Sequence, residues 1–595
     1  MGLFQQAIKT YDSMEKMGLV GKYEEGKEPL APIGHILAKA QIIITIDVTG
    51  NFISAEEADL KIIIPVTEES SGRTSSPSPH PLYDNIDYIS GIDEKKYNLF
   101  LKQMTMWEES EYGDDCITAV LNYIKGKTLI DDLSKSGLIK FDPNGNVVNK
   151  KDLVAWRVYG RKCKKENIYE DIELMNKYNQ FYMQVKGISK KEICYITGEE
   201  DFVASQHLKG VVSLNGNAKI VSANDNTNFT YRGRFIESKE ALSVGYTASQ
   251  KSHNALKWLA ANQKVVLGDR VLICWNPEGK KIPRPDSPLI RKSKEEIYKP
   301  SDYKEKLRSV LFSYKKSMGE FDEAVIVTFD AATTGRLSVS YYNEMKCSDF
   351  LERIEYWDDT CCWYDNNYGT YSPGLYDIVD VAFGFQRGNE DISRIETDPK
   401  VVSQHLQRLI KCRIDKTNIP RDILNAIISK TANLQIYNAH NRRKALFTAC
   451  AVIRKYYIDS RKEIWEMALD KDKKDRSYQF GRLLAVFEKI ERDVYSVSGE
   501  KRETNAIRMQ SVYVKRPAYA SKILLEQLKN SYYPKLTVGT RTYYDKLIGQ
   551  IMSIISEFGD DNFNKPLSET YLLGYYLQRN DLYTKKEETE DGKDE

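Results

Sequence analysis

Up to about residue 400, apolar residues gather in short runs separated by polar and turn-forming residues, which is the pattern of β-strands. Residues 40–47 (AQIIITID) and 59–65 (DLKIIIP) are rich in β-branched side chains. The Thr-Gly-Asn sequence at 49–51 predicts a hairpin-like connection between them. A more helical region is expected from residue 93 to residue 190. Further strands are predicted at residues 193–196, 218–222, 270–275, 324–329 and 336–342.

From residue 400 onward, apolar residues recur three and four positions apart, the spacing of amphipathic helices. The pattern predicts an α+β fold. A mixed α/β N-terminal body with antiparallel sheet elements is expected over residues 1–395, followed by an all-helical bundle over residues 396–595. The acidic end, residues 585–595, is expected to be disordered. The clearest helical stripes are Phe480, Leu483, Leu484, Phe487 and Ile490; Tyr544, Leu547, Ile548, Ile551 and Ile555; and Tyr571, Leu572, Tyr575 and Tyr576.

Charge and cysteine content limit the classes of protein to consider. The formal net charge is only +2 over 595 residues, so any surface for a polyanion must be local. Nine cysteines without a CxxC pair predict free thiols in a reducing compartment. No apolar run approaches the ~20 residues of a membrane span. These features predict a soluble protein without membrane contact.

Motifs for catalysis are missing. The six histidines, at 35, 80, 207, 253, 405 and 440, stand singly, which gives no metal-ligand spacing. Gly126-Lys127-Thr128 resembles the end of a phosphate-binding loop, but Leu121 stands where that loop needs glycine. The sequence therefore predicts a protein that is not an enzyme and needs no metal or cofactor. A nuclease site built from dispersed carboxylates remains the alternative.

The segment 67–82 (TEESSGRTSSPSPHPL) is too rich in Ser, Pro and Gly for a helix or a central strand. Within it, Ser70, Ser71, Gly72, Arg73 and Thr74 offer hydroxyls, backbone N–H groups and one guanidinium. Such groups contact phosphates, and small polar or arginine side chains fit a narrow minor groove. The alternative interpretation is a flexible Ser/Pro loop.

Two further polar segments are candidates for nucleic-acid contact. Asn215 and Asn217 place amides in a turn, which is equally consistent with a purely structural turn. Tyr231, Arg232 and Arg234 combine an aromatic face with guanidinium groups, the mixture that suits stacked bases and phosphates. The alternative is that these arginines are solvated. Residues 249–259 follow as a helix that would pack and hold this loop.

Basic residues recur on the predicted C-terminal helices, where they could form a discontinuous track for a single nucleic-acid strand. The alternative is a set of ordinary solvated helix faces. The candidates are Arg442, Arg443, Arg454, Arg482, Arg508, Lys515, Arg516 and Lys522.

Eight segments occur in one order over nearly the whole chain. They are LAPIGH (30–35), IPVTEESSGRTSSPSPHPLYDN (64–85), CYITGE (194–199), FTYRGRF with SQKSHNALKWL (229–259), GRLSVSYYNE (335–344), YSPGLYDIVDVAFG (371–384), RSYQFGRLLAVFE (476–488) and LLGYYLQRNDLY (572–583). This series resembles the large subunit of the type I-C (Dvulg subtype) CRISPR Cascade, the Csd family.

The resemblance implies a non-catalytic subunit of an RNA-guided surveillance complex in the prokaryotic cytoplasm. Such a subunit reads a protospacer-adjacent motif on duplex DNA, promotes strand opening and R-loop formation, and holds the displaced strand. The implied partners are CRISPR RNA, target DNA, the backbone and guide-handle-binding subunits, and a recruited helicase–nuclease. A small subunit is also implied, for which Met467 is the best-placed internal start.

The resemblance places adjacent-motif reading at residues 70–74, with Asn215, Asn217 and residues 231–234 as secondary contacts. Two other functions stay open. The chain could be a metal-dependent nuclease, or a structural assembly subunit whose polar loops contact only protein.

Overall fold

The computed structural model describes residues 1–73, 76–161, 164–187, 191–212, 214, 218–221, 235–236, 238–333, 335–388, 390, 392–500 and 502–584. The chain divides into two compact units. Unit 1 comprises Met1–Ile282 and Phe321–Met345, and unit 2 comprises Pro283–Glu320 and Lys346–Glu595. This division differs from a boundary after residue 395, because helices that precede residue 395 pack on the helices that follow it.

The first sheet of unit 1 is built on a long hairpin. Strand β1 (His35–Asp47) pairs antiparallel with β2 (Phe52–Pro65) and parallel with β3 (Val154–Tyr159), in the order β2-β1-β3. The predicted turn is confirmed, and Gly50 in it has a φ of +94°. A Cβ atom there would lie 2.6 Å from the carbonyl oxygen of Ala119, so the turn needs glycine.

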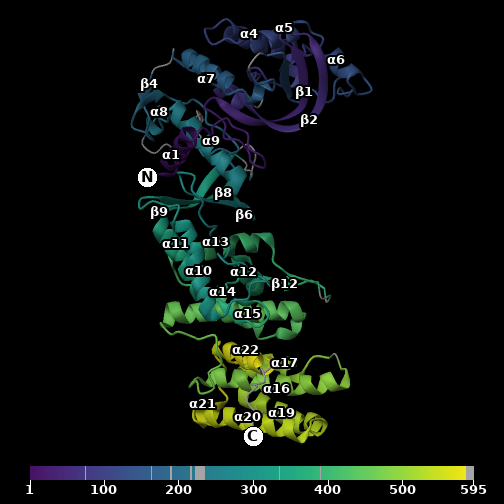
Figure 1. Cartoon of the computed structure of the whole chain (residues 1–595), viewed down its shortest axis with the longest axis vertical. Coiled ribbons are helices and arrows are strands. Elements are labelled where there is room, and N and C mark those ends of the chain that lie inside the picture. Colours follow the sequence, from purple (N-terminus) through teal and green to yellow (C-terminus); the bar gives the residue numbers. More distant parts are fainter. Residues whose placement is uncertain are drawn as a thin grey trace, which may run out of the picture. The chain divides into compact units, whose positions relative to one another are not determined.

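Helices cover this hairpin in unit 1 (Figure 1). Helix α5 (Asp115–Lys125) packs on β1 and β3, and α6 (Leu129–Lys135) packs on β2. Helix α4 (Glu94–Glu108) packs in turn on α5. The core between them is aliphatic and aromatic, and it includes Ile44 and Trp156, which are fully buried.

A second sheet of unit 1 has the order β6-β7-β8-β9. Its strands are β6 (Val265–Leu267), β7 (Arg270–Trp275), β8 (Glu323–Thr333) and β9 (Arg336–Lys346). The strands predicted at 270–275, 324–329 and 336–342 are thus confirmed. Residues 193–196 contribute only to the short strand β4 (Lys191–Ile193), paired with β5 (Glu200–Phe202). The strand expected at 218–222 is not formed in its described part, where Lys219 makes one isolated bridge to Arg336.

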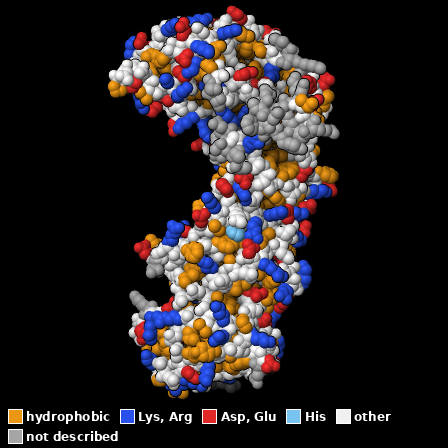
Figure 2. Space-filling view, turned by 180° about the vertical axis from the view of Figure 1, so that it is seen from behind, with side chains coloured by type: hydrophobic (Ala, Val, Ile, Leu, Met, Phe, Trp, Pro, Cys, Tyr) orange, Lys and Arg blue, Asp and Glu red, His pale blue; other side chains and the backbone are white. Residues whose placement is uncertain are grey.

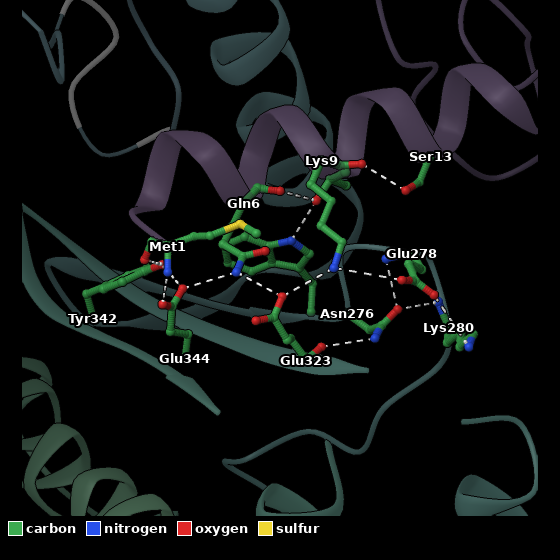
Figure 3. Close-up of polar contacts among 12 residues, drawn as sticks. Met1, Gln6, Lys9, Ser13, Asn276, Glu278, Lys280, Glu323, Tyr342 and Glu344 are labelled. Atoms are coloured by element: carbon green, nitrogen blue, oxygen red, sulfur yellow. Dashed lines mark hydrogen bonds and ion pairs between the residues drawn. The ribbon is translucent and has the colours of Figure 1, made fainter. Parts of the chain in front are cut away.

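Helix α1 (Leu3–Lys16) packs on α9 (Tyr246–Gln263), and polar contacts join α1 to the second sheet (Figure 3). The Nε2 atom of Gln6 donates to the carboxylates of Glu323 and Glu344 at 3.0 and 3.1 Å. The Lys9 ammonium lies 3.2 Å from the Glu323 carboxylate. The start of the chain is therefore fixed on strands that come some 320 residues later.

Among the described residues, the first part of unit 2 is mainly helical and contains two short antiparallel strand pairs, one of which joins β12 (Phe385–Gln386) to β13 (Ile395–Glu396). Its helices α10, α11 and α12 pack on those that follow residue 395. A buried ion pair joins Arg413 to Asp358 at 2.7 Å. The elements are α10 (Pro300–Lys315), α11 (Cys347–Thr360), β10 (Trp363–Asp365), β11 (Gly369–Tyr371), α12 (Leu375–Phe383), α13 (Pro399–Asp415), α14 (Arg421–Thr431) and α15 (Ala439–Tyr456).

In the C-terminal part of unit 2, α16 (Arg476–Ser498) lies between α22 (Thr570–Tyr583) and α20 (Val538–Ser556) (Figure 1). The apolar residues predicted to form stripes on these three helices are all buried. The α+β class is therefore confirmed, with small sheets in the N-terminal half and helices dominating the C-terminal part. Within the described residues, no helix has the length and apolar character that crossing a membrane requires.

Two glycines allow α16 and α22 to approach each other closely. A Cβ atom on Gly481 would lie 1.9 Å from the carbonyl oxygen of Tyr571, and one on Gly574 would lie 2.0 Å from that of Tyr478. We expect Gly481→Ala to destabilise unit 2 by about 1–3 kcal/mol in urea unfolding, because the carbonyl group of Tyr571 is part of the backbone and cannot move aside freely.

Gly549→Ala is the matched control for this substitution. Gly549 lies inside α20, and a Cβ atom there would meet nothing within 4 Å. This variant should be neutral or stabilised by up to about 1 kcal/mol, because alanine is the better helix former. Equal stability of the two variants would contradict the close contact of α16 with α22.

Candidate nucleic-acid interface

The predicted motif-reading segment begins with a short helix, α2 (Glu68–Ser71), capped by Thr67. The Ser70 hydroxyl lies 3.0 Å from Nδ1 of His80, and the Ser71 hydroxyl donates to the carbonyl of Glu68 at 2.9 Å. Ser70 is only 1% exposed and Ser71 is also buried. In this structure the two hydroxyls therefore close the segment on itself, and their part in reading an adjacent motif stays a prediction.

The Arg73 guanidinium is also engaged within its own segment. It makes two hydrogen bonds to the Asp84 carboxylate, at 2.6 and 2.8 Å, and one to the carbonyl of Ser78 at 2.9 Å. Its Cζ atom lies 4.5 Å from the centre of the Tyr88 ring. Asp84 is 0% exposed. Arg73 thus neutralises a buried carboxylate, and its donors are not directed toward a groove of DNA in this structure.

Gly72 brings a second segment against this one. A Cβ atom on Gly72 would lie 2.6 Å from the side-chain oxygen of Gln206. Lys209, on the same second segment, has its ammonium 3.5 Å from the carbonyl of Arg73. Thr74 lies outside the described residues. Residues 70–73 therefore support the neighbouring segment, and that segment brings the Lys209 cation to this place.

Three lysines of unit 1 form a cluster of uncompensated charge: Lys209, Lys219 on the segment that follows, and Lys257 on α9. Burial lowers the pKa of Lys209, and the Arg73 cation lowers it further. Burial and the Lys209 ammonium lower the pKa of Lys219 in the same way, and they lower that of Lys257 to about 8. Among the described residues, no carboxylate pairs with any of the three.

The histidines beside these lysines do not change the net charge of the cluster. Burial lowers the pKa of His207 to about 4, with a contribution from Lys219. Burial also lowers the pKa of His80, and the charges of Arg73 and Lys209 add to this effect. Both rings are therefore neutral at pH 7. A site that concentrates positive charge without an acidic partner is suited to phosphate groups.

The sequence pattern did not identify these lysines. Each stands alone among apolar or small residues (HLKG, NAKI and ALKW), so no run of basic residues draws attention to it. The only indication in the sequence is that these lysines occur close to the predicted contact segments 215–217 and 231–234. Those candidates themselves, Asn215, Asn217, Tyr231, Arg232 and Arg234, lie outside the described residues, and their roles stay predictions.

Half of the predicted C-terminal track is engaged inside unit 2. Arg482 is 2% exposed, and it donates to Gln578 at 2.9 Å and to the carbonyl of Lys471 at 2.6 Å. The expectation that it lies on a surface track is corrected, since α16 is covered on several sides. Arg454 donates to the carbonyls of Asp359 and Thr360. Arg442 pairs with Glu503, and Arg443 pairs with Asp365 at 2.8 Å.

The other half of the predicted track is exposed. Arg508, Lys515, Arg516 and Lys522 lie at the surface of α17 (Asn505–Arg508), α18 (Gln510–Lys515) and α19 (Pro517–Gln527) or at the junctions between them. None of the four pairs with a carboxylate of the described residues. The segment 504–546 contains eight Lys and Arg residues against two Asp and Glu residues. Elsewhere, on the face shown in Figure 2, basic and acidic side chains are interspersed.

Acidic, histidine and cysteine side chains do not gather into a metal site. In the described part of the chain, no group of three or more of them is arranged to hold a metal ion. The described residues do present two groups of cations: a lysine cluster beside the 67–84 segment of unit 1 and an exposed basic surface on α17–α19 of unit 2.

Comparison with known proteins gives one family. A family model described as "CRISPR-associated protein (Cas_Csd1)" matches residues 9–583. A search of curated proteins gives no match. Because the match spans nearly the whole chain, in both units, this protein belongs to the Cas_Csd1 family of CRISPR-associated proteins.

Proposed function

We propose that this chain is the large subunit of a type I-C CRISPR RNA-guided surveillance complex, and that it contacts the protospacer-adjacent part of double-stranded target DNA through unit 1. The observation that carries the proposal is the cluster of Lys209, Lys219 and Lys257, three cations that have no acidic partner among the described residues, in a family of CRISPR-associated proteins. Their ammonium groups would hold phosphates and fix the register of the duplex.

Guide pairing explains why such a subunit needs only a limited DNA surface. In RNA-guided recognition the base pairs with the guide carry most of the sequence information, and the protein reads a short duplex motif. Exchanging a DNA duplex for an RNA–DNA hybrid is nearly balanced in free energy, so contacts to duplex and displaced strand can tip it toward R-loop formation. Asn215, Asn217 and residues 231–234, which neighbour Lys209 and Lys219 in the sequence, are proposed to read the motif itself.

The direct test is a gel-shift titration of target duplex with the assembled complex. Complexes with and without this chain, and duplexes with an intact or altered adjacent motif, give four combinations. We expect the chain to strengthen binding and to create the preference for the intact motif. Equal affinity in the presence and absence of the chain would instead support a structural assembly subunit.

We further propose that the exposed basic surface of α17–α19 holds the displaced strand. Replacing Arg508, Arg516 and Lys522 with alanine should weaken nuclease protection of that strand. It should also reduce the salt dependence of target binding by about 0.7 in log–log slope for each lost phosphate contact. Alanine at Lys400, Lys411 and Arg421, three exposed cations of α13 and α14, is the control with the same charge change. Equal slopes for both variants would contradict the assignment.

The chain is proposed to have no catalytic role, with DNA cleavage left to a recruited helicase–nuclease. Incubation of the purified protein with labelled DNA, with and without Mg²⁺ or Mn²⁺, is expected to leave the DNA intact. Metal-dependent cutting would support a nuclease instead.

The remaining partners are proposals of the same kind. They are CRISPR RNA, the backbone and guide-handle-binding subunits, and a small subunit in the prokaryotic cytoplasm. A product starting at Met467 would contain α16 together with α20 and α22, which both pack on α16. Detection of a second, shorter product that disappears with Met467→Leu would test this internal start.

A further inference from the structure

Unit 2 contains a cavity of about 610 Å³ that the contacts proposed above do not use. It lies among the segment 287–292, strand β11, and helices α12 and α15. Its volume falls within the range of about 300–1,000 Å³ typical of ligand sites. Its lining is rich in cations and in aromatic rings.

Five cations line this cavity: Arg291, Lys292, Arg394, Arg443 and Lys444. Arg443 is paired with Asp365, and Lys444 is paired with Asp377 at 2.7 Å and Asp380 at 3.4 Å. Arg291, Lys292 and Arg394 form no ion pair with the described residues. Lys444 thus offsets one of the two acidic charges of the lining, and because the five cations outnumber the two carboxylates, a net positive charge remains.

Two helices add to this potential. The residues leading into α12, including Gly374, and the first turn of α15, including His440 and Asn441, line the cavity. Backbone N–H groups at the start of a helix favour anions. The pKa of His440 is lowered by burial and then by four of these cations, Lys292, Lys444, Arg394 and Arg443. The cations therefore act together on one point of the lining.

One wall of the cavity is aromatic. The rings of Tyr371 and Phe447 are stacked, with centroids 4.0 Å apart and an interplanar angle of 12°. Tyr368 meets Tyr371 edge-on at 6.5 Å. The Lys292 ammonium lies 3.7 Å from the centre of the Tyr368 ring. Lys292 therefore lies against this aromatic wall, so that a cation and two of the rings meet at the same place.

We propose that this cavity binds one nucleotide of a single-stranded nucleic acid, with the phosphate at Arg291, Lys292 and Arg394 and the base against the wall of Tyr368, Tyr371 and Phe447. An inorganic anion would use the cations but not the wall, and an apolar ligand would leave the cations unused. A nucleotide uses both, since every base has an aromatic face and every unit carries a phosphate. In binding, Lys292 exchanges its contact with Tyr368 for one with the phosphate.

The test uses the purified full-length chain and a fluorescent ten-nucleotide oligothymidylate. Replacing Arg291, Lys292 and Arg394 with alanine should weaken binding roughly tenfold, at the lower end of what one stacked base and its phosphate contribute. The control replaces Arg308, Lys315 and Lys316, three exposed cations of α10 and its C-terminal cap that do not line the cavity, and should change binding by less than about twofold. Equal losses in both variants would overturn the proposal.

Two measurements locate the base. Ultraviolet cross-linking followed by peptide mapping should attach thymidine to the peptide containing Tyr368 and Tyr371. Tyr368→Leu keeps an apolar side chain but removes the ring, and it should abolish the preference for oligothymidylate over an abasic strand with the same phosphates. Cross-links confined to other peptides, with the preference unchanged, would refute a base at this wall.

Competition with free thymidine monophosphate distinguishes a site for free nucleotides from a site for a nucleic-acid strand. Displacement of the cross-link by the mononucleotide would indicate a free-nucleotide site, and resistance to it would indicate a strand. The inference does not depend on duplex binding by unit 1. A cavity variant should retain the adjacent-motif preference, so the failure of either proposal can be recognised without the other.

Discussion

Replacing Arg73 with alanine is expected to destabilise unit 1 by about 3–5 kcal/mol, the largest effect of any single substitution considered for this chain. The reason is the environment of Asp84, which is 0% exposed and receives two of its hydrogen bonds from the Arg73 guanidinium. Without the guanidinium, a buried carboxylate would remain without a counter-charge. Urea unfolding, followed by far-ultraviolet circular dichroism, measures the change.

A surface pair of the same geometry provides the control. Arg408 makes two hydrogen bonds to Asp422, at 2.6 and 2.7 Å, but both side chains are substantially exposed. Arg408→Ala should cost only about 0–1 kcal/mol, because water screens the remaining carboxylate. The double variant Arg73→Ala/Asp84→Asn should recover part of the stability lost in Arg73→Ala, since no charge is then buried. Equal costs for the two single variants would show that burial of Asp84 is not the cause.

The pH dependence of Arg73→Ala has a defined sign. Burial raises the pKa of Asp84 even in the presence of Arg73, and removing the cation should raise this pKa further. As the pH falls through that raised value, the folded variant takes up a proton that the unfolded chain does not yet bind. The deficit relative to wild type should therefore shrink on acidification and grow toward neutral pH. A deficit independent of pH would contradict this account.

A loss of DNA binding by Arg73→Ala would not by itself show that Arg73 contacts DNA. Because its donors are used by Asp84 and Ser78, weaker binding would follow from loosening of the 67–84 segment rather than from a lost groove contact. Binding and unfolding should then be lost together. Weaker binding with full stability would return Arg73 to the role of a direct reader.

Replacing Lys209, Lys219 and Lys257 with methionine should have the second large effect, and here binding and stability should separate. Methionine keeps the apolar stem but removes three charges that repel one another, so stability should be unchanged or higher. Duplex affinity of the assembled complex should fall on the order of 100-fold, the effect of two to three lost phosphate contacts. The log–log salt slope should fall by about 0.9 per contact.

The matched control changes three exposed lysines of unit 1, Lys125, Lys135 and Lys140, to methionine. The net charge change is the same, so a long-range effect of charge would reduce affinity equally in both variants. We expect the control to change affinity by less than about threefold. Equal salt slopes for the cluster variant and wild type would exclude the lysine cluster as a phosphate contact.

Lys257 adds a pH test with opposite signs for binding and stability. Burial lowers its pKa from 10.5 to about 8, so its positive charge is lost as the pH rises through 8. Duplex binding should weaken between pH 7 and pH 9. Folding stability should rise between about pH 8 and pH 10.5, because in this window the unfolded chain binds the proton and the folded chain does not. Lys257→Met should remove both trends.

The sequence contained enough information to define the local elements and the class of fold. The hairpin of β1 and β2 and the strands β7, β8 and β9 follow from β-branched runs and turn residues. The helices α16, α20 and α22 follow from apolar spacing, and the stripe residues are buried. The eight ordered segments indicated the family that the match over residues 9–583 confirms. Hydrophobic periodicity is a local property, so it can be recognised without knowing which elements meet.

Only the tertiary structure decided what each charged side chain does. Arg73 and Arg482 look like ligand-binding cations in the sequence. In the fold, Arg73 donates hydrogen bonds to Asp84, and Arg482 donates to Gln578. Lys209, Lys219 and Lys257 look unremarkable in the sequence, yet folding brings them together with no carboxylate partner in the described part of the chain. The free energy of a charge depends on its burial and on its partners, and both are set by residues distant in the chain. The sequence therefore determined the elements and the family, while the positions of unpaired charge were decided by tertiary packing.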